Sequence, residues 1–233
     1  MRESIMKKWI VAPLAAVVLS ACMSTSNENA ATLDRNQAVA DLSVQMEELG
    51  FNRVEIQPGV DEFLNICASI LERQYNVMGE YRTQTENYVD VQAFLTAHQG
   101  KSEEELRAAI IAFDEKAETE DDKIGPKLAA YNSAIEGVSE QNTKLATDIT
   151  VQLAQAAIIL SEHSTTVAKA GSLGMVSGWM SGNEQNADNN LGLAILRAKD
   201  QIDLASDANE IITLEQETIE AINALQDELE AKG

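Results

Sequence analysis

Hydrophobic residues recur every three or four positions along most of the chain after residue 33. The pattern is clearest over residues 58–98, where one row steps by four and three without a slip: Val60, Leu64, Cys67, Leu71, Gln74, Met78, Tyr81, Thr85, Tyr88, Gln92 and Leu95. This spacing predicts a helix that packs in a bundle or coiled coil. A second row lies beside the first: Phe63, Ile66, Ile70, Val77 and Val91. The widened apolar face indicates that this helix contacts two neighbours.

A shorter helix is predicted before this segment, over residues 33–49, and residues 51–57 form a connection that could be extended. The composition agrees with helices, because aromatic residues make up only 4% of the chain and only three of 233 residues are proline.

A long helix is predicted after it, over residues 102–170. Its start has the capping-box pattern, with Ser102 followed three residues later by Glu105. Gly125-Pro126 should kink or interrupt this helix, because proline lacks a backbone donor and clashes with the preceding turn.

The last part of the chain predicts a hairpin. Residues 171–186 are rich in glycine, so no helix should persist there, and a final helix covers residues 187–231. Because residues 127–170 and 187–231 are nearly equal in length, we expect them to pack antiparallel. The helix over residues 58–98 should lie antiparallel to the first part of the long helix. The predicted fold class is therefore all-α, an elongated antiparallel helical bundle with long coiled-coil-like helices.

The N-terminus has the three parts of a secretory signal. Arg2, Lys7 and Lys8 give a basic start, and an apolar run over residues 9–19 is interrupted only by Pro13. The run is shorter than the roughly 20 apolar residues that cross a bilayer. It closes with Leu19-Ser20-Ala21-Cys22.

These last four residues resemble the lipobox of bacterial lipoproteins at every position. The resemblance covers about a tenth of the chain and implies that a peptidase removes residues 1–21 and that Cys22 carries diacylglycerol, usually with a further acyl chain such as palmitate on its amine. Residues 22–32 would form a flexible tether and residues 33–233 the bundle. Met23 after the cysteine implies the outer membrane if the source is Gram-negative. An ordinary secretory signal beside a chance cysteine is the alternative.

Charge excludes one class of partner. Removing residues 1–21 takes away three basic residues and one acidic residue, so the formal net charge changes from −21 to −23. Such a surface repels phosphate backbones, and nucleic-acid binding is not expected. If Cys22 carries lipid, Cys67 lacks an intramolecular partner, and its place on an apolar row favours a buried, inert thiol over an intermolecular disulfide.

Candidate chemistry is sparse, and we expect no enzymatic activity, cofactor or metal. The only histidines, His98 and His163, lack the spacing of zinc or di-iron sites, and His163 falls on a core row. Residues 186–190 imitate half of a calcium loop but favour a capped helix start. The acidic residues that precede Pro126 indicate a solvated surface rather than a site: Glu115, Glu118, Glu120, Asp121 and Asp122.

The glycine-rich segment holds a candidate contact tip. Its large apolar side chains are Leu173, Met175, Val176, Trp179 and Met180. Apolar residues concentrated in a loop often mark a contact site, although they could also fold back over the end of the bundle. We therefore expect a non-enzymatic, lipid-anchored scaffold or docking protein of the cell envelope, with an envelope protein or a second copy as partner. The alternative is a membrane-acting protein that looks loosely like helical pore-forming toxins, with residues 171–182 as its insertion element.

Overall fold

The computed structural model describes residues 34–177 and 190–232; the regular elements in these residues are all helices, joined by short connections, with no strand. The elements in chain order are α2 (Arg35–Leu49), α3 (Asp61–Asn87), α4 (Val89–His98), α5 (Glu103–Asp114), the short 3-10 helix η1 (Glu120–Asp122), α6 (Ile124–Glu162), α7 (Ser164–Ser177) and α9 (Leu191–Lys232). The predicted all-α bundle is confirmed.

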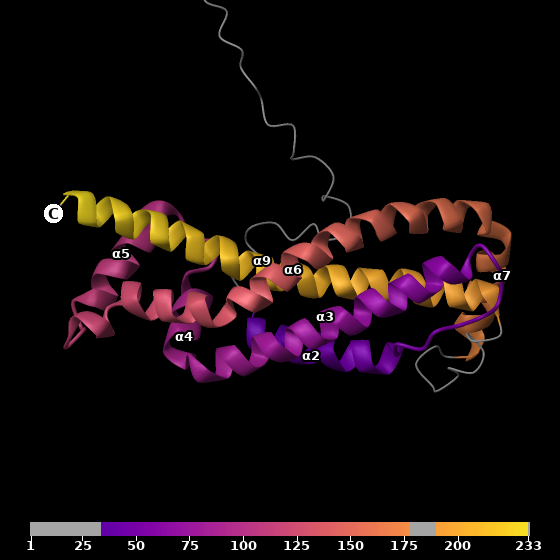
Figure 1. The fold of residues 1–233 in the computed structure, drawn as a ribbon, viewed down its shortest axis with the longest axis horizontal. Coiled ribbons are helices and arrows are strands. Elements are labelled where there is room, and N and C mark those ends of the chain that lie inside the picture. The colour runs from indigo at the N-terminus through magenta and orange to yellow at the C-terminus, as the bar shows by residue number, and fades with distance from the viewer. Residues whose placement is uncertain (1–33, 178–189, 233) are drawn as a thin grey trace, which may run out of the picture.

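The bundle is elongated, and helices α3, α6 and α9 run along its main axis (Figure 1). Helix α6 lies antiparallel to both α3 and α9, which confirms the predicted hairpin. The 58–98 segment was predicted to pack on the first part of the 102–170 helix; α3 packs on α6, whereas α5, which forms that first part, packs mainly on α9. Helix α2 lies beside α3 and α9 and begins near the middle of the long axis. Helices α4 and α5 build one end of the molecule, and α7 crosses the start of α9 at the other.

The core lies where the predicted hydrophobic rows meet. Every residue of the row over 58–98 is buried except Tyr88, which is half-buried. Apolar residues of α6 and α9 close the same core, among them Leu128, Ile135, Leu145, Ile202, Ile212 and Ile222. Burial of this continuous surface is the main force that holds the long helices together.

Side-chain caps mark three helix starts. Asp34 accepts a hydrogen bond from the backbone of Gln37, and Ser102 forms the predicted capping box with Glu105. Asn190 accepts from the backbone N–H of Leu193 at 3.2 Å, so the calcium-like segment does end in a capped helix start. The connection over residues 51–57 contains no strand and is fixed by Asn65, whose amide bonds both backbone groups of Val54.

One predicted helix is divided in two. The segment over residues 58–98 breaks at Tyr88, whose φ of −125° and ψ of 50° are not helical. No proline or glycine marks the break. The ring of Tyr88 packs at 5.3 Å from the ring of Tyr131, between centroids, and α4 leaves at a new angle that carries Gln92 toward the core. Tertiary packing therefore overrides a helical pattern that is locally continuous.

The interruption expected at Gly125-Pro126 lies upstream, in residues 115–123. The backbone N–H of Ile124 donates to Asp114 at 2.9 Å, which closes the connection and starts α6. Pro126 is the third residue of α6, where a missing N–H costs nothing because first-turn donors have no helical partner. The predicted helix over residues 102–170 is therefore interrupted, as one of the two expected outcomes, but the break lies before Gly125-Pro126 rather than at it.

The other end of the long helix also differs from the prediction. A break at His163 separates α6 from α7, and His163 is a half-buried helix cap rather than a core residue. Helix α7 then continues to Ser177, although we expected no helix after residue 170. Each glycine in a helix costs about 1 kcal/mol relative to alanine, but α7 packs closely on α9, and this contact outweighs the local preference.

No helix among the described residues is long and apolar enough to cross a membrane.

Candidate functional site

A charged pair lies at the centre of the bundle. Arg35, the first residue of α2, places Nη1 3.1 Å from Oε2 of Glu215 on α9. The side chains are 0% and 1% exposed. The other guanidinium nitrogen, Nη2, donates to the hydroxyl of Thr96 on α4 at 3.2 Å. Bringing two charges out of water is costly unless both are paired and hydrogen-bonded, so further partners are expected around the carboxylate.

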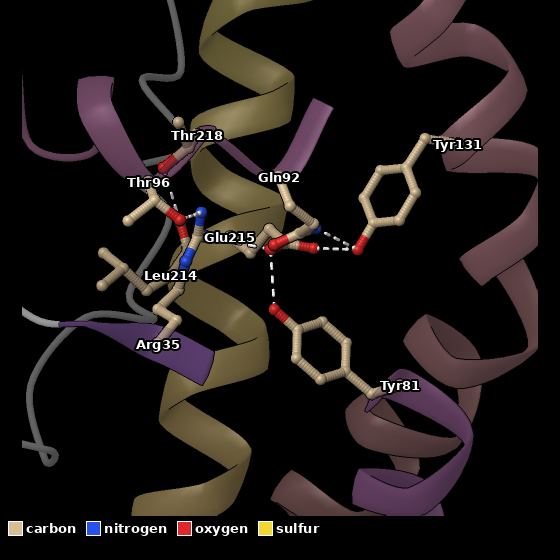
Figure 2. A network of polar contacts seen from close by, with 8 residues as sticks. All are labelled: Arg35, Tyr81, Gln92, Thr96, Tyr131, Leu214, Glu215 and Thr218. Carbon is tan, nitrogen blue, oxygen red and sulfur yellow. Dashed lines mark hydrogen bonds and ion pairs between the residues drawn. The ribbon is translucent and has the colours of Figure 1, made fainter. Parts of the chain in front are cut away.

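Three neutral donors complete the surroundings of Glu215, as Figure 2 shows. The Tyr81 hydroxyl of α3 donates to Oε2 at 2.7 Å, and the Tyr131 hydroxyl of α6 donates to Oε1. The amide of Gln92 on α4 donates to Oε2 at 3.0 Å and to the Tyr131 oxygen at 2.6 Å. We call these residues, with Arg35 and Thr96, the Glu215 cluster. It joins five helices: α2, α3, α4, α6 and α9.

The chemistry of the cluster is that of a fixed hydrogen-bond network. Burial, and after it the adjacent Glu215 carboxylate, raises the pKa of Tyr81 well above its ordinary value. The same two causes, burial first, raise the pKa of Tyr131. Both phenols therefore stay protonated and act as donors to the carboxylate. Nearby, the Thr218 hydroxyl donates to the backbone carbonyl of Leu214, one turn earlier in α9.

Three polar atoms of the cluster have no hydrogen-bond partner within the described part of the chain: Nε and Nη1 of Arg35 and Oε1 of Gln92. Nη1 is held by the ion pair with Glu215 alone. Gln92 and Thr96 also line an open groove of about 670 Å³ between the start of α2, the end of α3 and α4. The groove mixes charges of both signs, with Arg82 and Glu86 paired on its wall. It has no single chemical character that selects a ligand.

A second polar network lies farther along the same helices. Asn209 of α9 donates to the backbone oxygen and to Oδ1 of Asn142 on α6, at 2.7 and 2.8 Å, and Asn142 returns a bond to the Asn209 carbonyl at 3.1 Å. Gln74 of α3 donates to Asn142 at 3.2 Å. Reciprocal amide bonds of this kind form in only one alignment, so they fix the register of α6 against α9.

The positions singled out from sequence fall into separate places. The lipobox residues Leu19, Ser20, Ala21 and Cys22 lie outside the described residues. So do Trp179 and Met180 of the contact tip and the side chains of Leu173, Met175 and Val176. The lipidation and the tip contact therefore stay predictions.

The predictions for Cys67 and for the acidic residues before Pro126 can be checked against the structure. Cys67 is fully buried, and burial raises the pKa of its thiol to about 12, as expected for an inert cysteine. The acidic residues before Pro126 lie on the surface around η1. Among residues 34–177 and 190–232, no group of three or more histidine, cysteine or acidic side chains is arranged to hold a metal ion.

The Glu215 cluster was not predicted, although part of it has a sequence signal. The apolar row of α9 passes from Ile212 to Ile219, and Glu215 fills the intervening core position. In α6, Asn142 fills the same kind of gap between Val138 and Leu145. A polar residue where a row demands an apolar one indicates a buried network.

Comparison of the chain with protein-family models, with curated proteins and with solved structures gave no match.

Proposed function

We propose that this chain is a non-enzymatic, lipid-anchored scaffold or docking protein of the cell envelope. The observation that carries the proposal is that the buried charged and phenolic groups bond to one another. Arg35, Glu215, Tyr81 and Tyr131 bond one another across the helices, and all are at most 1% exposed. Groups engaged in this way hold helices in register, which is the task of a rigid scaffold.

The anchor is the part of the proposal that rests on sequence. The complete lipobox ends at Cys22, and two acyl chains hold a protein stably on a membrane without crossing it. The formal net charge of −23 that remains after removal of residues 1–21 would repel anionic headgroups, so the bundle would stand away from the lipid surface on its tether.

A matched pair of cysteine variants tests the anchor. Cys22→Ser should remove the added lipid mass and move the protein from the membrane fraction to the soluble fraction. Cys67→Ser also removes one thiol but should leave both properties unchanged. A Cys22→Ser protein that has lost residues 1–21, carries no added lipid mass and still stays on the membrane would refute the lipid anchor.

The docking role is tested by photo-crosslinking in the native cells, with probes at exposed positions along α6 and α9. Discrete protein adducts at a subset of positions support docking. Adducts to lipid alone, together with leakage of liposomes by unlipidated protein, would instead favour a membrane-acting protein.

A further inference from the structure

The outward face of α6 differs from the rest of this acidic surface. Eight residues between positions 147 and 161 are exposed: Thr147, Thr150, Val151, Ala154, Gln155, Ala157, Ile158 and Ser161. None carries a formal charge, whereas the chain as a whole has a net charge of −21. Charged exposed residues resume on either side, at Lys144 and Glu162.

Five of these residues form an uncharged row with an apolar centre, which we call the outer row: Thr147, Val151, Ala154, Ile158 and Ser161. It steps by four and three, as the seam of a coiled coil does, on the side opposite the buried row of α6. Val151 and Ile158 are 55% and 57% exposed. This half of α6 runs along the outer edge of the bundle, where another helix can approach (Figure 1).

The polar atoms on this face are partly withdrawn from solvent. The hydroxyl of Thr150 donates to the carbonyl of Ala146 at 2.8 Å, so its proton is already bonded within α6. Asp148 is only half-buried but is paired with Arg73 of α3 at 2.8 Å. The face is therefore suited to apolar helix packing.

Charge selects the kind of partner. A basic protein would be attracted to the acidic faces of the bundle and gain nothing from an uncharged one. Two copies of this chain repel each other at every acidic face, and an uncharged seam lets them approach. A two-fold dimer, in which the same face contacts itself, is the commonest form of oligomer.

The sequence of the outer row is also complementary to itself. If two copies pack antiparallel, Ile158 faces Thr147 of the second copy and Val151 faces its Ala154, so each large side chain lies against a smaller one. A parallel pair would place isoleucine on isoleucine and alanine on alanine, which leaves uneven layers. We propose that the outer row of α6 pairs antiparallel with the outer row of a second copy of this chain.

The size of the seam sets the strength of the dimer. Fifteen residues of helix span about 22 Å, and such a seam buries well under the roughly 800 Å² per partner of a standard interface. The dimer should be weak and reversible in solution and stronger where copies are concentrated on a surface. The inference deepens the proposed docking role by naming the partner, and only the gain from membrane concentration rests on the proposed lipid anchor.

Cysteine crosslinking of the full chain in cells tests the pairing. Two differently tagged copies, one Thr147→Cys and the other Ile158→Cys, should form a mixed disulfide dimer. As a matched control, Ile111→Cys replaces an exposed isoleucine of α5, outside the face, and should not crosslink to Thr147→Cys. Equal crosslinking of the control would overturn the inference, as would crosslinking of Thr147→Cys only with itself, which indicates a parallel pair.

Light scattering of the purified protein provides a second readout. The wild type should shift from monomer toward dimer as its concentration rises to about 1 mM. Ile158→Glu should weaken this association at least tenfold, and Ile111→Glu should leave it unchanged. Val151→Glu repeats the test should Ile158→Glu fold poorly by circular dichroism. A monomer at every concentration without the mixed disulfide, or a dimer that ignores Ile158→Glu and Val151→Glu, would overturn the proposal.

These outcomes separate the inference from the proposed function. Membrane release by Cys22→Ser without any mixed disulfide would leave the anchored scaffold standing and remove only the self-pairing. A mixed disulfide together with Cys22→Ser protein that stays membrane-bound would keep the dimer and remove the lipid anchor.

Discussion

Replacing Arg35 by methionine should strongly destabilise the bundle, because it breaks the buried ion pair with Glu215. Methionine fills much of the same volume but leaves the Glu215 carboxylate buried without its opposite charge. Removing one partner of a buried ion pair typically costs about 3–5 kcal/mol. Tyr81→Phe, which removes one of the three neutral donors, should cost less, about 1–3 kcal/mol.

The expected loss is large on the scale of a whole domain. Domains of this size unfold at a cost of about 5–15 kcal/mol, so Arg35→Met should remove a third or more of a typical value. For a chain of 150–250 residues each kcal/mol lowers the melting temperature by about 2–4 °C, which predicts a decrease of about 6–20 °C.

Urea unfolding followed by far-ultraviolet circular dichroism measures the effect. The protein for this assay begins at residue 22 and carries Cys22→Ser, so that it contains every described residue without a lipid. Adding Glu215→Gln to Arg35→Met should recover part of the loss, because the unpaired charge is removed. If Arg35→Met lies within 1 kcal/mol of wild type, or if the double variant shows no coupling, the cluster does not hold the helices as argued.

Four further predictions use the same protein. Asn142→Leu should lose about 1–3 kcal/mol in urea unfolding, because it removes the Oδ1 atom that accepts buried hydrogen bonds from Gln74 and Asn209. Burial, Asp203 and Glu210 raise the pKa of Asp207 above its unfolded value of 3.8. The charged carboxylate therefore destabilises the fold at pH values above the raised pKa, and this effect disappears as the pH falls below 3.8. Asp207→Asn should accordingly raise the melting temperature at neutral pH but not near pH 3. Gly192→Ala should lower the melting temperature, because its Cβ would lie 2.6 Å from a backbone oxygen of α7. Cys67 should react with a thiol reagent at about pH 8 only after unfolding.

Each of these has a contrary result. An unchanged Asn142→Leu would mean that the amide network contributes no net stability, and a destabilised Asp207→Asn at neutral pH would reverse the sign of the burial effect. A Gly192→Ala protein as stable as wild type would show that α7 yields without cost. Rapid labelling of Cys67 in native protein would require the core around it to open readily.

The long helices of this fold could be predicted because the spacing of apolar residues by three and four repeats many times along each of them. The row over residues 58–98 and the matched lengths around residue 170 were sufficient to place α3, α6 and α9 and to orient α6 against the other two. A single polar residue in such a row changes the average pattern little. For this reason Gln74 and Gln92 could be placed in the core row, but their hydrogen-bond partners could not be predicted.

The breaks and the cluster depend on contacts between distant residues. No residue near Tyr88 in the sequence would be expected to interrupt a helix. The break is explained by the contacts of Gln92 with Tyr131 and Glu215, which lie 39 and 123 residues away in sequence. Arg35 gives no signal at all, since an arginine in the first turn of a helix normally lies on the surface. Glu215 was visible as a gap in the α9 row, but its partners were not.

The position of Arg35 has a mechanical consequence. The chain before residue 34 joins the bundle near the middle of its long axis, at the first residue of α2 (Figure 1). A force that pulls on that end meets the ion pair to Glu215 first, and only after its rupture can α2 peel away through Val39, Leu42 and Met46. Such an arrangement withstands tension up to a threshold and then yields one turn at a time, so the Glu215 cluster would set the force at which the first helix detaches.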